Sequence, residues 1–253
     1  MMRFALLSTL LLVLVLAAGC GARGTSPAPV TTTDPIQFEG IPEFNRMVLE
    51  EIAIYPTDGT HGYWWPRGEE LAETLGEGAR FTGVTRDIYL GGQRIMFGEP
   101  QGRTYCCGVT LEAFHAAWER WLDKYGEPED NPLTPETWRQ FQRYWFVLET
   151  NGPGPSLALE EFGLGRTIEP EEALPGDFVQ IWRRQGSGHS VIFLSWVRDE
   201  DGEIAGFRYW SSQPGTDGIA PAIEYFAPEG AERGMAWEHT HWGRAEPPKA
   251  TGG

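Results

Sequence analysis

Two adjacent cysteines and one distant histidine are the residues of this chain whose types and spacing could do chemistry. Cys106 and Cys107 stand with Gly108 directly before a helical pattern. At the N-terminus of a helix, unpaired backbone N–H groups and the positive end of the helix dipole favour a thiolate over a thiol. The same N–H groups can stabilise the oxyanion that forms when a thiolate adds to a carbonyl. This position therefore predicts a nucleophilic cysteine.

A nucleophilic cysteine needs a base, usually a histidine that another part of the fold supplies. His189 follows a glycine-rich turn and begins the apolar run His189–Val197. The block Pro175-Gly176-Asp177 introduces the preceding apolar segment, Phe178–Trp182, so the two segments predict a strand, a tight turn and a second strand. A histidine at the first position of a strand is held rigidly. We therefore expect the imidazole of His189 to lie within hydrogen-bonding reach of the Cys106 thiol.

The second cysteine keeps further alternatives open. Cys107 lies four and seven residues before Leu111 and Phe114, on the face that the helical pattern buries, so it is an alternative nucleophile. A disulfide between Cys106 and Cys107 would strain the peptide between them and could gate activity. Either thiol could instead be an inert buried side chain, as most free cysteines are.

The first half of the chain carries helical patterns and the second half carries strand patterns. Apolar spacing and capping residues predict helices at Glu43–Tyr55, at Glu69–Leu75, around Leu111–Leu122 with an end near Gly126, and from Thr134-Pro135 through Trp138, Phe141, Trp145 and Leu148. The glycine-rich stretch Gly83–Thr104 predicts a loop. Strands are predicted at Phe178–Trp182, His189–Val197, Gly206–Ser212 and Ala222–Phe226. Helices followed by an antiparallel sheet predict an α+β fold.

The order of these motifs resembles a known family of cell-wall hydrolases. A cysteine and glycine at a helix start, then Pro175-Gly176-Asp177 before a strand, then Gly188-His189 before a second strand, resemble the NlpC-type hydrolases and the related CHAP amidases. The resemblance covers about residues 88–225, and its most specific part is the combination of the last two blocks. It implies a papain-like α+β domain in which the nucleophile heads a helix and the histidine begins a strand.

The resemblance also implies roles for individual residues. Cys106 matches the nucleophile and His189 the general base, while a third polar residue from the following strand orients the imidazole. Gln213 is favoured for that third role because an amide carbonyl can accept the imidazole N–H, and Ser211 is the alternative. Tyr89 is a candidate oxyanion donor, although it lies one position from the tyrosine of the family. Tyr105 stands where the family usually has an aspartate.

The N-terminal residues predict export. Arg3, an apolar run too short for a membrane span, and small residues before Cys20 are typical of a signal peptide followed by a lipidation site. We therefore predict a lipoprotein signal peptide at residues 1–19, a flexible tether lipidated at Cys20 over residues 20–36, and one domain over residues 37–253. Gly21 is not the aspartate that retains lipoproteins at the inner membrane. The predicted location is the cell envelope, with the outer membrane facing the periplasm favoured.

The charge of the chain excludes some classes of partner. Without Arg3, the exported chain has 19 lysines and arginines against 36 aspartates and glutamates, a net charge of −17. Such a domain repels nucleic acid and anionic bilayers, so we predict no nucleic-acid partner and a membrane contact only through the lipid on Cys20. The expected partner is peptidoglycan, through its stem peptides, or another peptide or amide substrate. No cofactor or metal is predicted, although His239 and His241 would suit zinc if a third ligand joined them.

Clustered aromatic residues leave a function without catalysis open. Tyr63, Trp64 and Trp65 are consecutive, and the chain has 11 tryptophans in all. Such a cluster can form the floor of a groove that binds glycan or peptide, or it can belong to the core. The alternative to a cysteine hydrolase is therefore a papain-like domain that binds the envelope or the cell wall without cleaving it.

Overall fold

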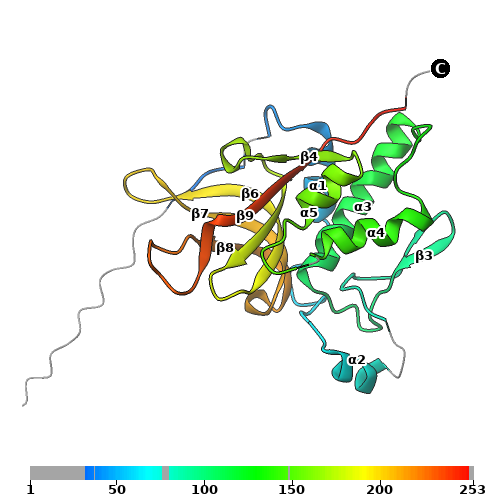
Figure 1. Cartoon of the computed structure of the whole chain (residues 1–253), viewed down its shortest axis with the longest axis horizontal. Coiled ribbons are helices and arrows are strands. Elements are labelled where there is room, and N and C mark those ends of the chain that lie inside the picture. Colours follow the sequence, from blue (N-terminus) through cyan, green and yellow to red (C-terminus); the bar gives the residue numbers. More distant parts are fainter. Residues whose placement is uncertain (1–31, 37, 76–79, 148, 251–253) are drawn as a thin grey trace, which may run out of the picture.

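The computed structural model describes residues 32–250 apart from residues 37, 76–79 and 148 (Figure 1). Its helices are α1 (Glu43–Ile52), α2 (Gly68–Leu75), α3 (Cys106–Tyr125), α4 (Pro135–Trp145) and α5 (Pro155–Glu161), with short 3-10 turns η1 (Pro170–Glu172) and η2 (Pro214–Thr216). Its strands are β1 (Thr32–Thr33), β2 (Ile88–Leu90), β3 (Gln93–Met96), β4 (Gly165–Ile168), β5 (Phe178–Arg183), β6 (Gly188–Arg198), β7 (Ile204–Gln213), β8 (Gly218–Tyr225) and β9 (Met235–Ala245). The predicted α+β class is confirmed.

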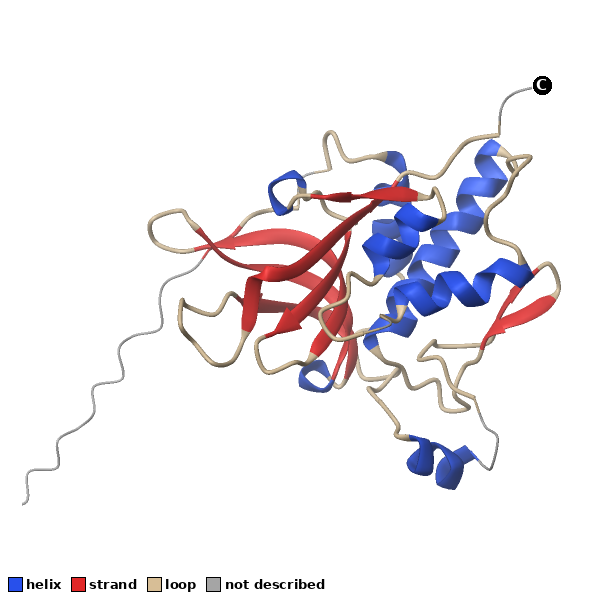
Figure 2. Cartoon of the chain, in the orientation of Figure 1, coloured by secondary structure: helices blue, strands red, loops and turns tan. Residues whose placement is uncertain are grey.

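One antiparallel sheet dominates the second half of the chain. Its strands lie in the order β4-β9-β5-β6-β7-β8, with the short β1 paired to the far end of β6, while β2 and β3 form a separate hairpin. Strands β5, β6, β7 and β8 follow one another as a meander, and β9 returns to pair with β5. Figure 2 shows the strands curling on one side of the molecule and the longer helices gathered on the other. The domain is therefore a helical layer against one curved sheet.

The two faces of the sheet bury separate hydrophobic cores. Successive strand residues point to opposite faces, so Phe178 packs among the helices while Val179 belongs to the other core. The helical face carries Phe178, Ile192, Leu194 and Trp210. The opposite face is lined by Val179, Ile181, Val191, Phe193, Phe207 and Trp242. The second core is made of residues from the sheet itself, and the strands curl around it. The helices cover the other face, the one that carries Phe178.

Helix α3 is the central element of the helical layer. Phe114 contacts Phe44 of α1 at a ring separation of 5.6 Å and Trp145 of α4 at 5.2 Å. Trp145 in turn contacts Phe178 of β5 at 4.9 Å. Aromatic pairs of this kind bury large apolar areas and fix the orientation of the elements that carry them. The start of α3 is thereby held against the sheet.

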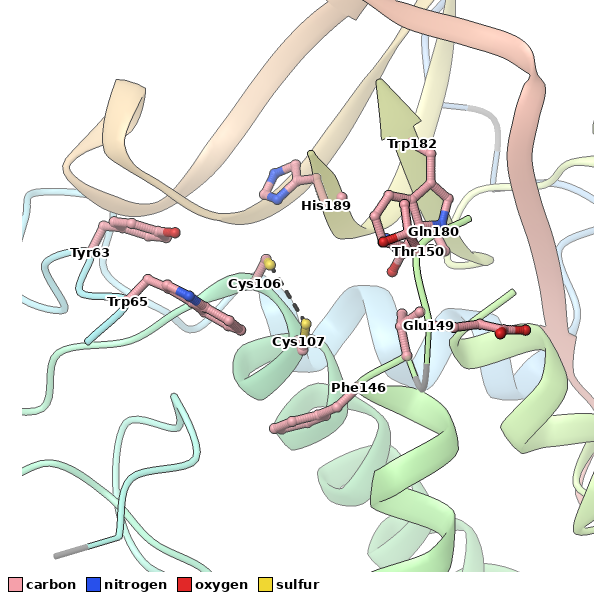
Figure 3. Close-up of a pocket in the computed structure, with 12 residues that line it drawn as sticks. Tyr63, Trp65, Cys106, Cys107, Phe146, Glu149, Thr150, Gln180, Trp182 and His189 are labelled. Carbon is pink, nitrogen blue, oxygen red and sulfur yellow. Dashed lines mark hydrogen bonds between the residues drawn. The ribbon is translucent and has the colours of Figure 1, made fainter. Parts of the chain in front are cut away.

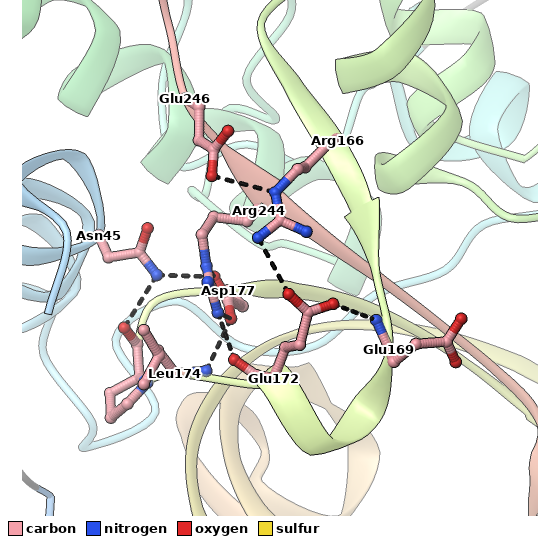
Figure 4. Close-up of polar contacts among 9 residues, drawn as sticks. Asn45, Arg166, Glu169, Glu172, Leu174, Asp177, Arg244 and Glu246 are labelled. Carbon is pink, nitrogen blue, oxygen red and sulfur yellow. Dashed lines mark hydrogen bonds and ion pairs between the residues drawn. The ribbon is translucent and has the colours of Figure 1, made fainter.

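The Pro-Gly-Asp block fixes the start of β5 to two other elements (Figure 4). The fully buried Asp177 carboxylate accepts two hydrogen bonds from the Arg244 guanidinium of β9, at 2.9 and 2.7 Å, and one from the Asn45 amide of α1, at 2.7 Å. Gly176 has a φ of 92°, and a Cβ there would lie 2.7 Å from the Asn45 carbonyl oxygen. The close approach of α1 leaves no room for a Cβ at residue 176, which explains the glycine. It also brings Asn45 to the buried pair of Asp177 and Arg244.

Several elements differ from the sequence predictions. Helix α1 ends at Ile52, before the predicted end at Tyr55, and the stretch predicted as a loop contains the hairpin β2–β3. Gly91 and Gly92 turn this hairpin with φ angles of 55° and 79°, which glycine adopts readily. Helix α5 and strand β4 lie between the helix predicted through Leu148 and the strand predicted from Phe178, where no element is predicted. Leu148, predicted as the last apolar position of that helix, lies outside the described residues.

The described chain begins within the segment predicted to be a tether. Thr32 and Thr33 pair with Arg198 and Val197 of β6, and the Asp34 carboxylate lies 3.0 Å from the Arg198 guanidinium. Ordered structure therefore begins before residue 37, because β-branched threonines suit a strand and the ion pair fixes the segment that follows. The predicted signal peptide and the lipidation site at Cys20 lie outside the described residues. Within residues 32–250 as described, no helix has the length and apolarity that a bilayer crossing requires.

Candidate active site

Helix α3 places both cysteines in its first turn. Tyr105 is the N-cap with extended backbone angles (φ −143°, ψ 166°), and no side chain caps the helix start. The Thr110 hydroxyl donates to the carbonyl oxygens of Cys106 and Cys107, at 3.0 and 3.2 Å. Gly108 is required because a Cβ there would lie 2.3 Å from the backbone of Gly83. The first turn is thus fixed in position while its leading N–H groups stay free of helical partners.

Strand β6 places His189 at its second residue. Gly186 makes the preceding turn with a φ of 84°, and His189 pairs with Ile181 of β5. The imidazole is 5% exposed and meets the Tyr209 ring of β7 edge-on, with 5.4 Å between the ring centroids. Two neighbouring strands therefore hold the ring, as expected for a histidine at the start of a strand in the middle of a sheet.

The structure brings Cys106 and His189 to one pocket. This pocket has a volume of about 550 Å³ and lies between the start of α3 and residues of the neighbouring central strands β5 and β6. In Figure 3 the sulfur of Cys106 is turned toward the imidazole of His189. The structure thus places the two side chains in one pocket, and the dashed hydrogen bond drawn there joins the two cysteines.

The surroundings of Cys106 favour its thiolate. A hydrogen bond from the Cys107 thiol lowers the pKa of Cys106 most strongly, burial opposes this, and a hydrogen bond and attraction from His189 lower the pKa further. The Ser190 backbone N–H acts in the same direction. Together they hold the pKa of Cys106 well below its usual range. A thiolate with an adjacent imidazole is the arrangement that nucleophilic catalysis by cysteine requires.

Cys107 differs from Cys106 although the two residues are adjacent. Its sulfur lies 3.7 Å from that of Cys106, and in Figure 3 Cys106 lies between it and the imidazole. The hydrogen bond that it gives to Cys106, together with burial, raises the pKa of Cys107 well above the usual thiol range. Cys107 therefore stays a thiol at neutral pH, and the geometry favours Cys106 over Cys107 as the nucleophile.

The aromatic cluster divides between the pocket and the core. Tyr63 and Trp65 line the pocket, whereas Trp64 is buried under the Arg103 guanidinium, which lies 3.9 Å from the centre of its ring. Burial, and next the negative charge of the Cys106 thiolate, raises the pKa of Tyr63 to about 12. The Tyr63 hydroxyl is therefore a neutral hydrogen-bond donor beside the thiols at physiological pH.

Other walls of the pocket were not singled out in the sequence. Phe146 follows the end of α4, and Trp182 lies on β5, where its indole N–H donates to the Gly152 carbonyl oxygen at 2.9 Å. Gln180, also of β5, is buried beside them. Glu149 is the sole Asp or Glu among the described residues that line the pocket, and neither Lys nor Arg occurs there. Only the meeting of α4 with β5 assembles this wall, so no local sequence pattern could have identified it.

The residues predicted to orient His189 have other partners. The Gln213 carbonyl oxygen accepts a hydrogen bond from the Tyr209 hydroxyl at 2.7 Å, and the Ser211 hydroxyl donates to the Ser190 carbonyl oxygen at 2.7 Å. The Nε2 atom of His189 is buried and has no hydrogen-bond partner among the described residues. The prediction for Gln213 placed it on the correct strand, but Tyr209 competes for its carbonyl, and the imidazole is held by ring packing instead.

The remaining candidates lie away from the pocket. Tyr89 is 53% exposed on the β2–β3 hairpin and is not among the pocket residues, which does not support it as an oxyanion donor. The His241 ring bonds to the Asn151 carbonyl oxygen at 3.0 Å, and neither His239 nor His241 lines the pocket. Among the residues with a described placement, no three histidine, cysteine or carboxylate side chains gather as a metal site would require.

Comparison with known proteins gives no relative for this chain. No family model matches it, and neither the curated proteins nor the solved structures contain a match. The chemistry of the chain must therefore be inferred from the pocket that holds Cys106, Cys107 and His189.

Proposed function

We propose that the chain is a cysteine hydrolase, an amidase or peptidase of papain-like fold. The observation that carries the proposal is the placement of Cys106 and His189. A thiol in the first turn of α3 and an imidazole at the start of β6 face each other in a pocket open to solvent. The lowered pKa of Cys106 supports the same assignment. The order of nucleophile, Pro-Gly-Asp block and histidine along the chain, similar to the NlpC-type and CHAP hydrolases, adds to it.

The proposed reaction proceeds through an acyl-enzyme. The Cys106 thiolate attacks the carbonyl carbon of an amide, and the free N–H groups of the first turn of α3 stabilise the oxyanion. His189 gives its proton to the leaving amine as the C–N bond breaks, which leaves a thioester on Cys106. The neutral imidazole then takes a proton from water, and the hydroxide displaces Cys106 to release the acid. Tyr63 is placed to donate a hydrogen bond to the substrate.

The proposed substrate is an amide bond of peptidoglycan stem peptides. The resemblance to cell-wall hydrolases and the predicted lipid anchor at Cys20 both support this substrate, because a tethered domain in the envelope meets the wall. The aromatic walls made by Trp65, Phe146 and Trp182 suit a peptide or sugar backbone packed along the pocket.

The test is digestion of purified wall material, with the products identified by mass. We expect the wild type to release products with a new amine and a new carboxylate. Cys106→Ala removes the nucleophile, and His189→Ala removes the base, which lowers the rate by about 10²- to 10⁴-fold. Cys107→Ala is the comparison variant: it keeps Cys106 and His189 but removes the hydrogen bond to Cys106, so we expect a smaller loss of rate than in Cys106→Ala. Full loss in Cys107→Ala with activity kept in Cys106→Ala would reassign the nucleophile, and equal activity in all four proteins would refute the proposal.

A wall-binding domain without catalysis is the second candidate. The unpartnered Nε2 of His189 favours this candidate. A catalytic imidazolium is stabilised by an acceptor on its second N–H, and no described residue supplies one. The same digestion distinguishes the two. A binding domain sediments with wall material and releases no products, and Cys106→Ala leaves this binding unchanged.

A further inference from the structure

The pocket holds two thiols in contact beside one imidazole, whereas a cysteine hydrolase needs only one thiol as its nucleophile. Their sulfur atoms are 3.7 Å apart, and both line the open pocket although each residue is under a tenth exposed. Attack on amides by Cys106 needs no second thiol. Beyond its hydrogen bond to Cys106, Cys107 is therefore a reactive group that neither forms nor breaks a bond in the proposed hydrolysis.

We propose that Cys107 is the resolving thiol of a reversible oxidation site, which forms a disulfide with Cys106 after a peroxide has oxidised Cys106. In the first step the Cys106 thiolate attacks one oxygen of hydrogen peroxide. The O–O bond breaks, hydroxide leaves, and Cys106 becomes a sulfenic acid. In the second step the Cys107 sulfur attacks the Cys106 sulfur, the S–O bond breaks, and the Cys107 proton joins the leaving hydroxide as water. Peroxide supplies both oxidising equivalents.

The surroundings of the two thiols set the order of these steps. Only Cys106 meets His189, so Cys106 is the thiolate that peroxide oxidises first. The charge on Cys106 is one cause of the raised pKa of Cys107, and that charge disappears once Cys106 is a sulfenic acid. Oxidation of the first sulfur therefore makes the second sulfur a better nucleophile.

The start of α3 makes this disulfide easy to reduce. Adjacent Cα atoms lie about 3.8 Å apart across a trans peptide, which is closer than in most disulfides, so the closed ring is strained. The Thr110 hydroxyl also bonds to the carbonyl oxygens of both cysteines, and closing the ring must turn the peptide between them. We expect a bond that protects Cys106 from further oxidation and that small thiols reopen.

Peroxide treatment of the full chain tests the proposal. The tryptic peptide Thr104–Arg120 contains both thiols and no other cysteine, so its mass reports on this site alone. In the wild type we expect this peptide to lose two hydrogens and to recover both thiols in dithiothreitol. In Cys107→Ala and Cys107→Ser we expect it to gain two oxygens on Cys106, with about tenfold less thiol recovered by dithiothreitol. The serine variant serves if the alanine variant does not fold.

Two results would overturn the proposal. One is conversion of wild-type Cys106 to the sulfinic acid at the rate seen in Cys107→Ala. The other is a disulfide that links two chains instead of Cys106 and Cys107 of one chain. None of these readouts uses a substrate, so loss of the disulfide and loss of hydrolysis are separate outcomes. In Cys106→Ala, Cys107 should stay reduced, because the group that oxidises first is absent.

Discussion

Burial changes the pKa of several ionisable side chains in this protein, and His115 is the simplest case. Burial within α3, and next the nearby Arg86 charge, lowers the pKa of His115 from 6.5 to about 4. The exposed Glu119 carboxylate, 3.5 Å from Nδ1, would act in the opposite direction. Burial outweighs it because the imidazole is enclosed, with Trp138 edge-on at 5.4 Å and Nε2 unpartnered among the described residues.

We predict that His115 makes the domain sensitive to mild acid. The unfolded chain binds a proton on this imidazole below about pH 6.5, whereas the native state resists it down to about pH 4. The free energy of unfolding is therefore highest above pH 6.5 and falls by about 3 kcal/mol from this group as the pH drops to 4. Urea unfolding of the wild type and His115→Gln at pH 7, 5 and 4 measures the difference. Identical pH dependence in the two proteins would contradict the assignment.

At the residue scale, the sequence predicts the two side chains that the pocket brings together but not the residues that support them. Cys106 and His189 were predictable because a helix start and a strand start each leave a local pattern. The partner of Gln213 was not, because its carbonyl accepts from the Tyr209 hydroxyl, and the rotamers along β7 that bring these two groups together leave no local pattern. The different protonation states of Cys106 and Cys107 were not predictable either, because they depend on which of the two sulfur atoms lies beside β6.

Among the elements, the start of β5 bears a fully buried charge, the Asp177 carboxylate. Asp177 links β5 to Arg244 of β9 and to Asn45 of α1. The following strand, β6, begins with the glycine and histidine of the site and pairs with β5 over residues 188–192. The Pro-Gly-Asp block therefore influences the position of His189 indirectly: it fixes the start of β5, and β5 pairs with the strand that carries His189.

We predict that Asp177→Asn destabilises the domain by about 3–5 kcal/mol, because it leaves the Arg244 charge buried without its partner. The matched control is Glu172→Gln, which removes the carboxylate that pairs with Arg166 at the surface, 3.1 Å away. This control should cost less than about 1 kcal/mol. Urea denaturation measures both, and an Asp177→Asn protein within 1 kcal/mol of wild type would show that the ion pair is not what holds β5.

Element prediction succeeded where caps and long periodic patterns exist. Thr134 and Pro135 open α4 as expected, and Gly126 ends α3 with a φ of 80°. Helix α5 has seven residues and β4 has four, which are too few to show a period. Strand β9 carries polar residues and histidines at its centre, and its pairing with both β4 and β5 joins segments far apart in the chain.

For the whole molecule, the central feature is that the site joins two layers. Cys106 belongs to the helical layer and His189 to the sheet, and each is held by its own layer. The rings of Phe114, Trp145 and Phe178 connect those layers beneath the pocket. The α+β class was predictable from the order of patterns, whereas the curl of the sheet around its second core was not, because it depends on contacts between distant strands.

The most direct test of the pairing between the layers is the rate of Cys106 alkylation by iodoacetamide as a function of pH. The tryptic peptide Thr104–Arg120 reports it in the wild type and in His189→Ala. We predict a wild-type midpoint well below the ordinary thiol pKa of about 8.5, and a higher midpoint with slower labelling at neutral pH in His189→Ala. Two superimposed profiles with an ordinary thiol midpoint would contradict the account.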